Sequence, residues 1–270
     1  MHIQPEAFRH WVDHFYGYGS WDAKIWFVAY EEGGGDLPED VLARLNYFHK
    51  NHAKAVVPSL CDIRGLYKAV PARVEGTKAE LYKTQYDYRF GPKATQHGAW
   101  KNLIAFEHGF LGKKIPDLLK YQQTFFALAT ENKTALIDLF PLPSPHNHAW
   151  YYSWLDMPAF PYLKSRNLYE MALFEERTRG IFENISKHTP DVVVMYGMSN
   201  IASLKSAVQH LFPTSRFTMV KGKPEIIPQH HRTEIGETIL IITTQIPTLR
   251  HGRPGTGFDW YEFGKSIRNL

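Results

Sequence analysis

The stretch Ala23–Gly35, AKIWFVAYEEGGG, is the starting point for interpreting the rest of the chain. Residues Ile25 to Ala29 form a short apolar run rich in β-branched and aromatic side chains, which predicts a buried strand. The run ends at two carboxylates, Glu31 and Glu32, followed by three glycines. Glycine lets the backbone approach a ligand closely, and open α/β sheets bind ligands beyond the carboxyl ends of their strands. The stretch therefore favours two interpretations about equally, a ligand site or a solvated acidic turn.

Further apolar runs predict the remaining strands, and amphipathic stretches between them predict helices. The strand candidates are Thr134–Phe140, Asp191–Tyr196, Phe217–Val220 and Glu237–Thr243. The helix candidates are Pro5–Tyr16, Pro38–Asn51, Trp100–Phe110, Ile115–Ala129, Leu168–Lys187, Asn200–Leu211 and a C-terminal helix from Phe258. Strands that alternate with helices in this way predict an α/β fold with a mainly parallel sheet.

The composition fits one globular unit. The chain has 270 residues, a hydrophobic content of 44% and a formal net charge of +4, which permits nucleic-acid binding without requiring it. We expect a single domain over residues 1–270 with insertions near 52–98 and 143–166. The single cysteine, Cys61, excludes a disulfide framework. With no apolar signal region or membrane-spanning run, we expect a cytoplasmic monomer without a membrane partner.

The order of the loops that follow the strands resembles the uracil-DNA glycosylase superfamily. Ala29–Gly34, AYEEGG, is similar to the family loop that carries a catalytic carboxylate. In LIDLFPLP, Asp138 stands where the family has a base-reading asparagine. Val192–Ser203 is similar to the Gly-x-x-Ala helix start, and Thr243–Gly252, TTQIPTLRHG, is similar in position to the final His-Pro-Ser-Pro-Leu-Ser loop. The chain departs from the pattern in three places, because the acidic loop lacks proline, Asp138 replaces asparagine, and Gln245 or Ile246 replaces the histidine.

The resemblance implies a three-layer α/β/α sandwich with a central four-stranded, mainly parallel sheet. It also implies a DNA base glycosylase without a cofactor, which hydrolyses the N-glycosidic bond of a flipped base and leaves an abasic site. One member of the superfamily acts on a modified base in phage defence, so antiviral defence is an implied setting. Two alternatives stay open, a non-catalytic nucleic-acid or nucleotide-binding module on the same fold and a hydrolase that acts on a small nucleoside or sugar-linked substrate.

The loops that carry the resemblance also contain the expected site residues. Neighbouring residues of an extended chain point in opposite directions, so we expect one of Glu31 and Glu32 to face the pocket. Motif spacing favours Glu31 as the catalytic carboxylate, with Glu32 bonded to the glycine backbone or solvated. The expected catalytic residues are Glu31, Glu32 and His251, and the expected base-binding residues are Tyr30, Asp138 and Trp150. The expected DNA-binding residues are Gly33, Gly34, Pro247, Leu249, Arg250 and Arg253.

Asp138 bears on the choice of base. An ionised carboxylate offers acceptors alone, whereas an amide offers a donor and an acceptor. A carboxylate therefore favours an amino-bearing base, such as a modified cytosine, over the O4 carbonyl of uracil. The alternative is that Asp138 caps the proline-rich loop after its strand.

Metal and nucleotide-cofactor sites are not expected. His146 and His148 are spaced i, i+2 without a cysteine or a carboxylate pair, which is a weak zinc signal. The glycines at 33–35 lack the spacing of a dinucleotide-binding loop, and no phosphate-binding Gly-x-x-x-x-Gly-Lys motif occurs in the chain.

Overall fold

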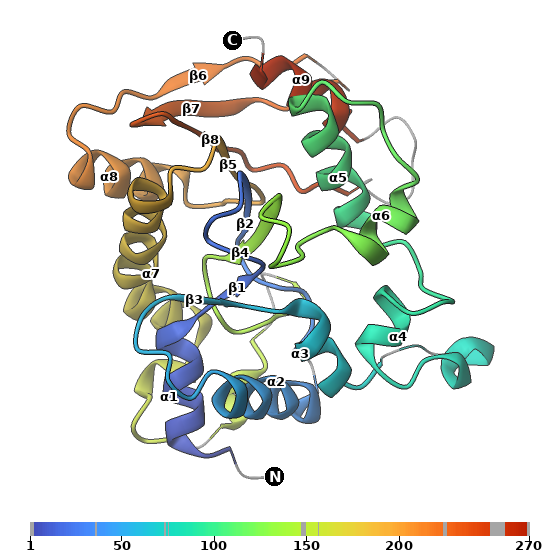
Figure 1. The fold of residues 1–270 in the computed structure, drawn as a ribbon. Coiled ribbons are helices and arrows are strands. Elements are labelled where there is room, and N and C mark those ends of the chain that lie inside the picture. Colours follow the sequence, from blue (N-terminus) through green and yellow to red (C-terminus); the bar gives the residue numbers. More distant parts are fainter. Residues whose placement is uncertain are drawn as a thin grey trace.

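The computed structural model describes residues 3–35, 37–72, 74, 76–146, 150–155, 157–223, 226–248 and 257–268. This part of the chain is an α/β fold with one mixed eight-stranded sheet in the order β3-β1-β4-β2-β5-β8-β7-β6 (Figure 1). The strands are β1 Phe15–Tyr18, β2 Ile25–Ala29, β3 Ser59–Cys61, β4 Thr134–Asp138, β5 Val192–Met195, β6 Thr218–Val220, β7 His230–Ile235 and β8 Thr238–Ile242.

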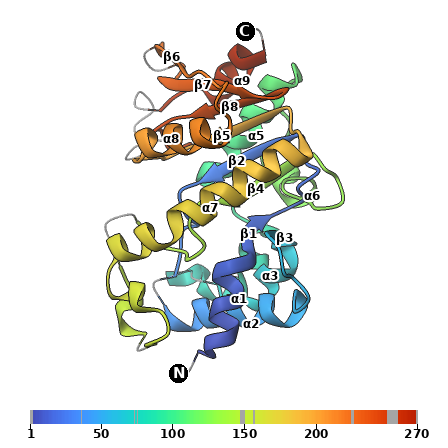
Figure 2. The same ribbon diagram turned by 90° about the vertical axis from the view of Figure 1, so that its left-hand side faces the viewer.

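Nine α-helices are present among the described residues. They are α1 Pro5–His14, α2 Pro38–Asn51, α3 Ile63–Ala69, α4 Gln85–Arg89, α5 Gly98–Phe110, α6 Leu118–Thr124, α7 Arg166–His188, α8 Ile201–Leu211 and α9 Trp260–Arg268. Short 3-10 helices cover Gly76–Leu81, Tyr152–Trp154 and Pro161–Lys164. Helices α5 and α9 lie on one side of the sheet and α7 and α8 on the other (Figures 1 and 2).

The centre of the sheet consists of four neighbouring parallel strands, β4, β2, β5 and β8. All residues of β4 and β5 are buried, as continuous apolar runs require when helices cover both faces. In the register of β2 and β4, Ala29 lies opposite Asp138. The residues that leave these two strands therefore emerge side by side at one edge.

The sheet is twice as wide as the four strands expected from the resemblance, so that expectation was wrong in strand number. Strand β1 begins inside the stretch Pro5–Tyr16 predicted as the first helix, and that helix ends at His14. Gly17 has a φ of 133°, and a Cβ there would lie 2.1 Å from the Leu136 carbonyl oxygen. The backbone of β4 therefore leaves no room for a side chain at position 17. Glycine at this position allows β1 and β4 to pair.

Other boundaries differ for local reasons. Helix α6 covers Leu118–Thr124, less than the predicted Ile115–Ala129, since Ala127 adopts a left-handed φ of 51° that ends helical geometry. Strand β7 was not predicted. It pairs antiparallel with β8, and Gly236 in the connecting turn has a φ of 59°. Its sequence, HHRTEI, mixes polar and apolar residues as a strand near a sheet edge does.

A buried arginine of α7 fixes the end of β4. The Arg177 guanidinium donates to the carbonyl oxygens of Asp138 at 2.8 Å, Leu139 at 3.0 Å and Phe15 at 2.7 Å. It also lies 3.5 Å from the centroid of the Tyr16 ring. These carbonyls lie where regular strand pairing stops, so the guanidinium satisfies acceptors that would otherwise be buried without a partner.

We predict that Arg177→Met lowers the free energy of unfolding by about 3–5 kcal/mol, because it leaves several buried carbonyls without donors. Arg179→Met is the matched control, since Arg179 lies on the same helix and forms an exposed pair with Glu175. Its loss should cost about 0–0.5 kcal/mol. Urea unfolding of the wild type and both variants measures the two values, and equal losses would contradict the role given to Arg177.

Candidate functional site

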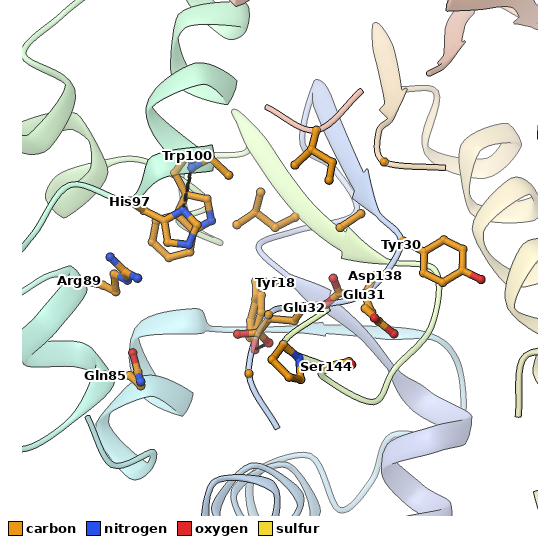
Figure 3. A pocket seen from close by; sticks show the side chains of 18 of the residues that line it. Tyr18, Tyr30, Glu31, Glu32, Gln85, Arg89, His97, Trp100, Asp138 and Ser144 are labelled. Carbon is orange, nitrogen blue, oxygen red and sulfur yellow. Dashed lines mark hydrogen bonds between the residues drawn. The ribbon is translucent and has the colours of Figure 1, made fainter. Parts of the chain in front are cut away.

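The residues that follow β2 and β4 line one cavity at the carboxyl edge of the parallel strands. The cavity has a volume of about 640 Å³ and is lined by Tyr30, Glu31, Glu32 and Asp138, together with residues from several other elements (Figure 3). Gly33 also lines it. These residues, which were expected at the carboxyl ends of the strands, therefore lie together.

Glu31 forms an ion pair with an arginine of helix α7. Arg166, the first residue of α7, donates from Nη1 to Oε2 at 3.0 Å and from Nη2 to Oε1 at 2.9 Å. Arg166 also contacts Glu170 at 3.2 Å and donates to the Ser144 hydroxyl at 2.8 Å. Burial raises the pKa of Glu31, and the hydrogen bonds and charge of Arg166 oppose that rise. The bidentate pair fixes the plane of the carboxylate.

Glu32 belongs to a separate network on the other side of the chain. Its Oε2 accepts from the Tyr18 hydroxyl at 2.5 Å and from Arg44 Nη1 at 2.7 Å, and its Oε1 accepts from the Tyr67 hydroxyl at 2.8 Å. Arg44 also pairs with Asp40 at 2.6 Å. The expectation that Glu32 bonds the glycine backbone or water was therefore wrong. The two glutamates have different partners, but both line the cavity, so the expectation that one of them alone faces the pocket was wrong.

Asp138 differs from both glutamates, because no donor among the described residues hydrogen-bonds its carboxyl oxygens. The residue is 6% exposed and lines the cavity, whereas its backbone carbonyl is bonded to Arg177. Burial raises the pKa of Asp138 well above its ordinary value, and the negative charge of Glu32 adds to the rise. The alternative that this side chain caps the following loop receives no support from its contacts.

The three glycines bring the acidic loop against its neighbours. Gly34 lines the cavity with Gly33 and has a φ of 126°. At Gly35 a Cβ would lie 2.2 Å from the Pro143 carbonyl oxygen. A side chain at Gly35 would separate the loop after β2 from the loop after β4, whereas a Cβ at Gly33 would meet no atom within 4 Å.

The two aromatic residues expected to contact a base lie in different places. Tyr30 lines the cavity and packs on Phe140 with ring centroids 5.0 Å apart, and its hydroxyl points away from the other labelled residues in Figure 3. Trp150 is not among the residues that line the cavity. It donates to the Leu163 carbonyl at 2.7 Å and lies 5.8 Å from the Arg166 guanidinium. Trp150 therefore packs near Arg166 and does not line the cavity.

The loop after β8 is described in part. Pro247 is buried, and its carbonyl accepts from Asn102 Nδ2 at 2.6 Å, while Ile246 reaches the cavity. The expected catalytic His251 and the expected DNA-binding Leu249, Arg250 and Arg253 lie outside the described residues. Of the two histidines weighed as metal ligands, His146 lines the cavity and His148 lies outside the described part. Among the described residues, no group of three or more His, Cys, Asp or Glu side chains is placed to hold a metal ion.

Several cavity residues were missed by the sequence analysis. They are Tyr18 of β1, Arg44 of α2, Tyr67 of α3, Tyr88 and Arg89 of α4, and His97 and Trp100 at the start of α5. Most belong to, or adjoin, the segment interpreted as an insertion, in which the mixture of aromatic and polar residues Tyr82–Gln96 was the available signal. For Arg44 the signal was its i, i+4 spacing from Asp40.

Comparisons with protein-family models, with curated proteins and with solved structures found no significant match. The site is therefore interpreted from its own geometry. Among the described helices, none has the length and apolar character needed to cross a membrane.

We predict that Asp138→Asn stabilises the protein, increasingly so as the pH rises. A carboxyl group with a raised pKa in the folded state binds more protons there than in the unfolded state, so the stability of the wild type falls as the pH rises through that interval. Asparagine does not ionise and is free of this loss. Thermal unfolding at pH 4 and pH 8 should give a larger gain in Tm at pH 8, and a gain that is the same at both values would contradict a buried, titrating Asp138.

Proposed function

We propose that this protein hydrolyses the N-glycosidic bond of a nucleotide in DNA and releases its base. The observation that carries the proposal is the convergence of Glu31, Glu32 and Asp138 from two adjacent parallel strands on one cavity. Ligands of open α/β sheets bind at this edge, and breaking a glycosidic bond creates positive charge on the sugar that a fixed carboxylate stabilises.

Glu31 is the group proposed to act at the sugar. As the bond between C1′ and the base nitrogen breaks, its electron pair leaves with the base and C1′ becomes positively charged. An ionised Glu31, fixed by Arg166, stabilises that charge and orients the water whose oxygen bonds to C1′. The water gives up a proton and the departing base gains one, so the products are a free base and an abasic sugar.

Asp138 is the group proposed to read the base, since its carboxyl has no described protein partner and faces the cavity. Burial raises the pKa of Asp138, so its neutral form is more stable than that of an exposed aspartate. A neutral carboxyl offers one O–H donor and one acceptor, as an amide does, whereas the ionised form offers acceptors alone. We propose that an amino-bearing base, such as a modified cytosine, is preferred when Asp138 is ionised and that this preference weakens when it is neutral.

The arrangement of the sheet supports the resemblance to the uracil-DNA glycosylase superfamily. Counting the four central strands in chain order, the second, first, third and fourth lie side by side and run parallel. This order gathers the loops after β2 and β4 at one edge, as the resemblance requires. Membership of the superfamily, the DNA partner and a role in antiviral defence are parts of the proposal.

We predict that Glu31→Gln lowers base release by about 10²- to 10⁴-fold while DNA affinity stays within a few-fold of the wild type, because the amide cannot stabilise a cationic sugar. Glu175→Gln is the control, since Glu175 is an exposed glutamate of α7 with 86% side-chain exposure. Free base is quantified by mass spectrometry after incubation with DNA containing uracil, hypoxanthine, cytosine or hydroxymethylated cytosine. Binding without release from any of these DNAs by the wild type would favour a non-catalytic binding module.

We predict that the ratio of release from amino-bearing bases to release from uracil rises with pH in the wild type. Deprotonation of Asp138 removes the donor that a neutral carboxyl can offer to O4 of uracil. In Asp138→Asn the ratio should be independent of pH, because the amide keeps its donor. Initial rates at pH 5.5 and pH 8.5 on matched oligonucleotides provide the measurement. A wild-type ratio that stays flat, or uracil as the preferred base at high pH, would refute the role given to Asp138.

A further inference from the structure

The wall of the cavity that faces the carboxylates is built from the segment between β3 and α5. Gln85, Tyr88, Arg89 and His97 line it, and Figure 3 places Arg89 and His97 on the far side of the cavity from Glu31 and Asp138. No carboxylate from this segment lines the cavity among the described residues. We call Tyr88, Arg89 and His97 the donor wall, because each carries an N–H or O–H group.

Arg89 is the charged group of the donor wall. Its guanidinium lies 4.2 Å from the centroid of the Tyr88 ring, and no carboxylate among the described residues pairs with it. The other arginines near the cavity differ, since Arg44 pairs with Glu32 and Asp40, and Arg166 pairs with Glu31. Arg89 therefore presents to the cavity a positive charge that the described protein groups do not neutralise. Arg89 is half-buried, and a charge that is partly removed from water is stabilised by a counterion, which a ligand in the cavity can supply.

His97 presents a neutral donor beside Arg89. Its Nδ1 accepts from the backbone N–H groups of Ala99 at 3.2 Å and Trp100 at 3.3 Å, so the proton of the neutral ring is on Nε2. The ring stacks on Trp100 with centroids 4.5 Å apart. Burial, with a contribution from the charge of Arg89, lowers the pKa of His97 to about 3. The ring thus stays neutral over the pH range in which proteins are active, and the backbone bonds fix its orientation.

We infer that the donor wall binds a phosphate group of the nucleotide whose sugar lies at Glu31. A guanidinium and neighbouring N–H and O–H donors, without a carboxylate, match a group that carries negative charge and only acceptors. The carboxylates across the cavity do not compete for these donors, because Glu31 is bonded to Arg166 and Glu32 is bonded to Arg44. A cavity of about 640 Å³ is within the range of roughly 300–1,000 Å³ that holds ligands larger than a free base. The inference rests on the proposed function, since it places a nucleotide in this cavity.

Calorimetric titration tests the inference with 2′-deoxycytidine, its 5′-monophosphate, a short oligodeoxycytidylate and inorganic phosphate as probes. For the wild type we expect the monophosphate or the oligonucleotide to bind at least about tenfold more tightly than the nucleoside, as charge-assisted hydrogen bonds to an arginine provide. Arg89→Gln should abolish that difference. Arg216→Gln, which removes the same charge from an exposed position, should retain it.

The probes separate the sources of the phosphate. An Arg89-dependent gain for the mononucleotide supports a free nucleotide, and a gain confined to the oligonucleotide supports the DNA backbone. Equal binding of nucleoside and both phosphate-bearing probes by the wild type overturns the inference, and this comparison needs no variant to fold. An unchanged gain in a folded Arg89→Gln protein also overturns it. Because the readout is binding, absence of base release would count against the proposed function alone.

Discussion

The hydrogen bonds of Arg177 to three carbonyl oxygens hold the site together, because they fix the place where β4 ends. A guanidinium carries five donors in one plane, so a single side chain can serve acceptors from β1 and from the chain leaving β4. The backbone of Asp138 is thereby anchored without using its carboxyl group, which remains directed at the cavity. The same helix begins at Arg166, which holds Glu31. Helix α7 therefore holds two acidic residues in place. Arg166 binds the carboxylate of Glu31 in the loop after β2, and Arg177 binds the backbone of Asp138 at the end of β4.

The acidic residues Glu31, Glu32 and Asp138 lie on one side of the cavity, and Arg89 lies on the other. Glu31 and Glu32 lie among tyrosines and paired arginines, in surroundings that favour an ordered carboxylate. Asp138 has a raised pKa because its burial is compensated by no hydrogen bond from the described residues. Arg89 lies across the cavity without an acidic partner among those residues. A buried carboxyl group with a strongly raised pKa, across a cavity from a cation without a carboxylate partner among the described residues, is typical of a site that binds and transforms a ligand.

The sequence was sufficient to predict the centre of the sheet and the acidic edge of the site. Strands of parallel α/β sheets are continuous apolar runs, so Ile25–Ala29 and Val192–Met195 were visible without structural information. Helix α2 was predicted over its observed span, Pro38–Asn51. The shared cavity of Asp138 and Glu31 agrees with the expectation that ligands bind at the carboxyl ends of parallel strands, where Ala29 lies opposite Asp138.

The remaining features depend on tertiary contacts that leave no periodic signal. Strand β3 has three residues, too few to show alternation, and β1 is a strand because Gly17 accommodates the backbone of β4. The pairing of Glu31 with Arg166 joins residues 135 positions apart. His97 lines the cavity because two backbone N–H groups orient its ring, a local arrangement that the residue type alone does not reveal.

The central claim is that the cavity holds a nucleotide with its glycosidic bond at Glu31. A crystal structure of the Glu31→Gln variant with a bound oligodeoxynucleotide tests it most directly. The account predicts one nucleotide inside the cavity, with C1′ next to residue 31 and the base edge next to Asp138. Nucleic acid bound on another surface, with the cavity occupied by solvent alone, would contradict it.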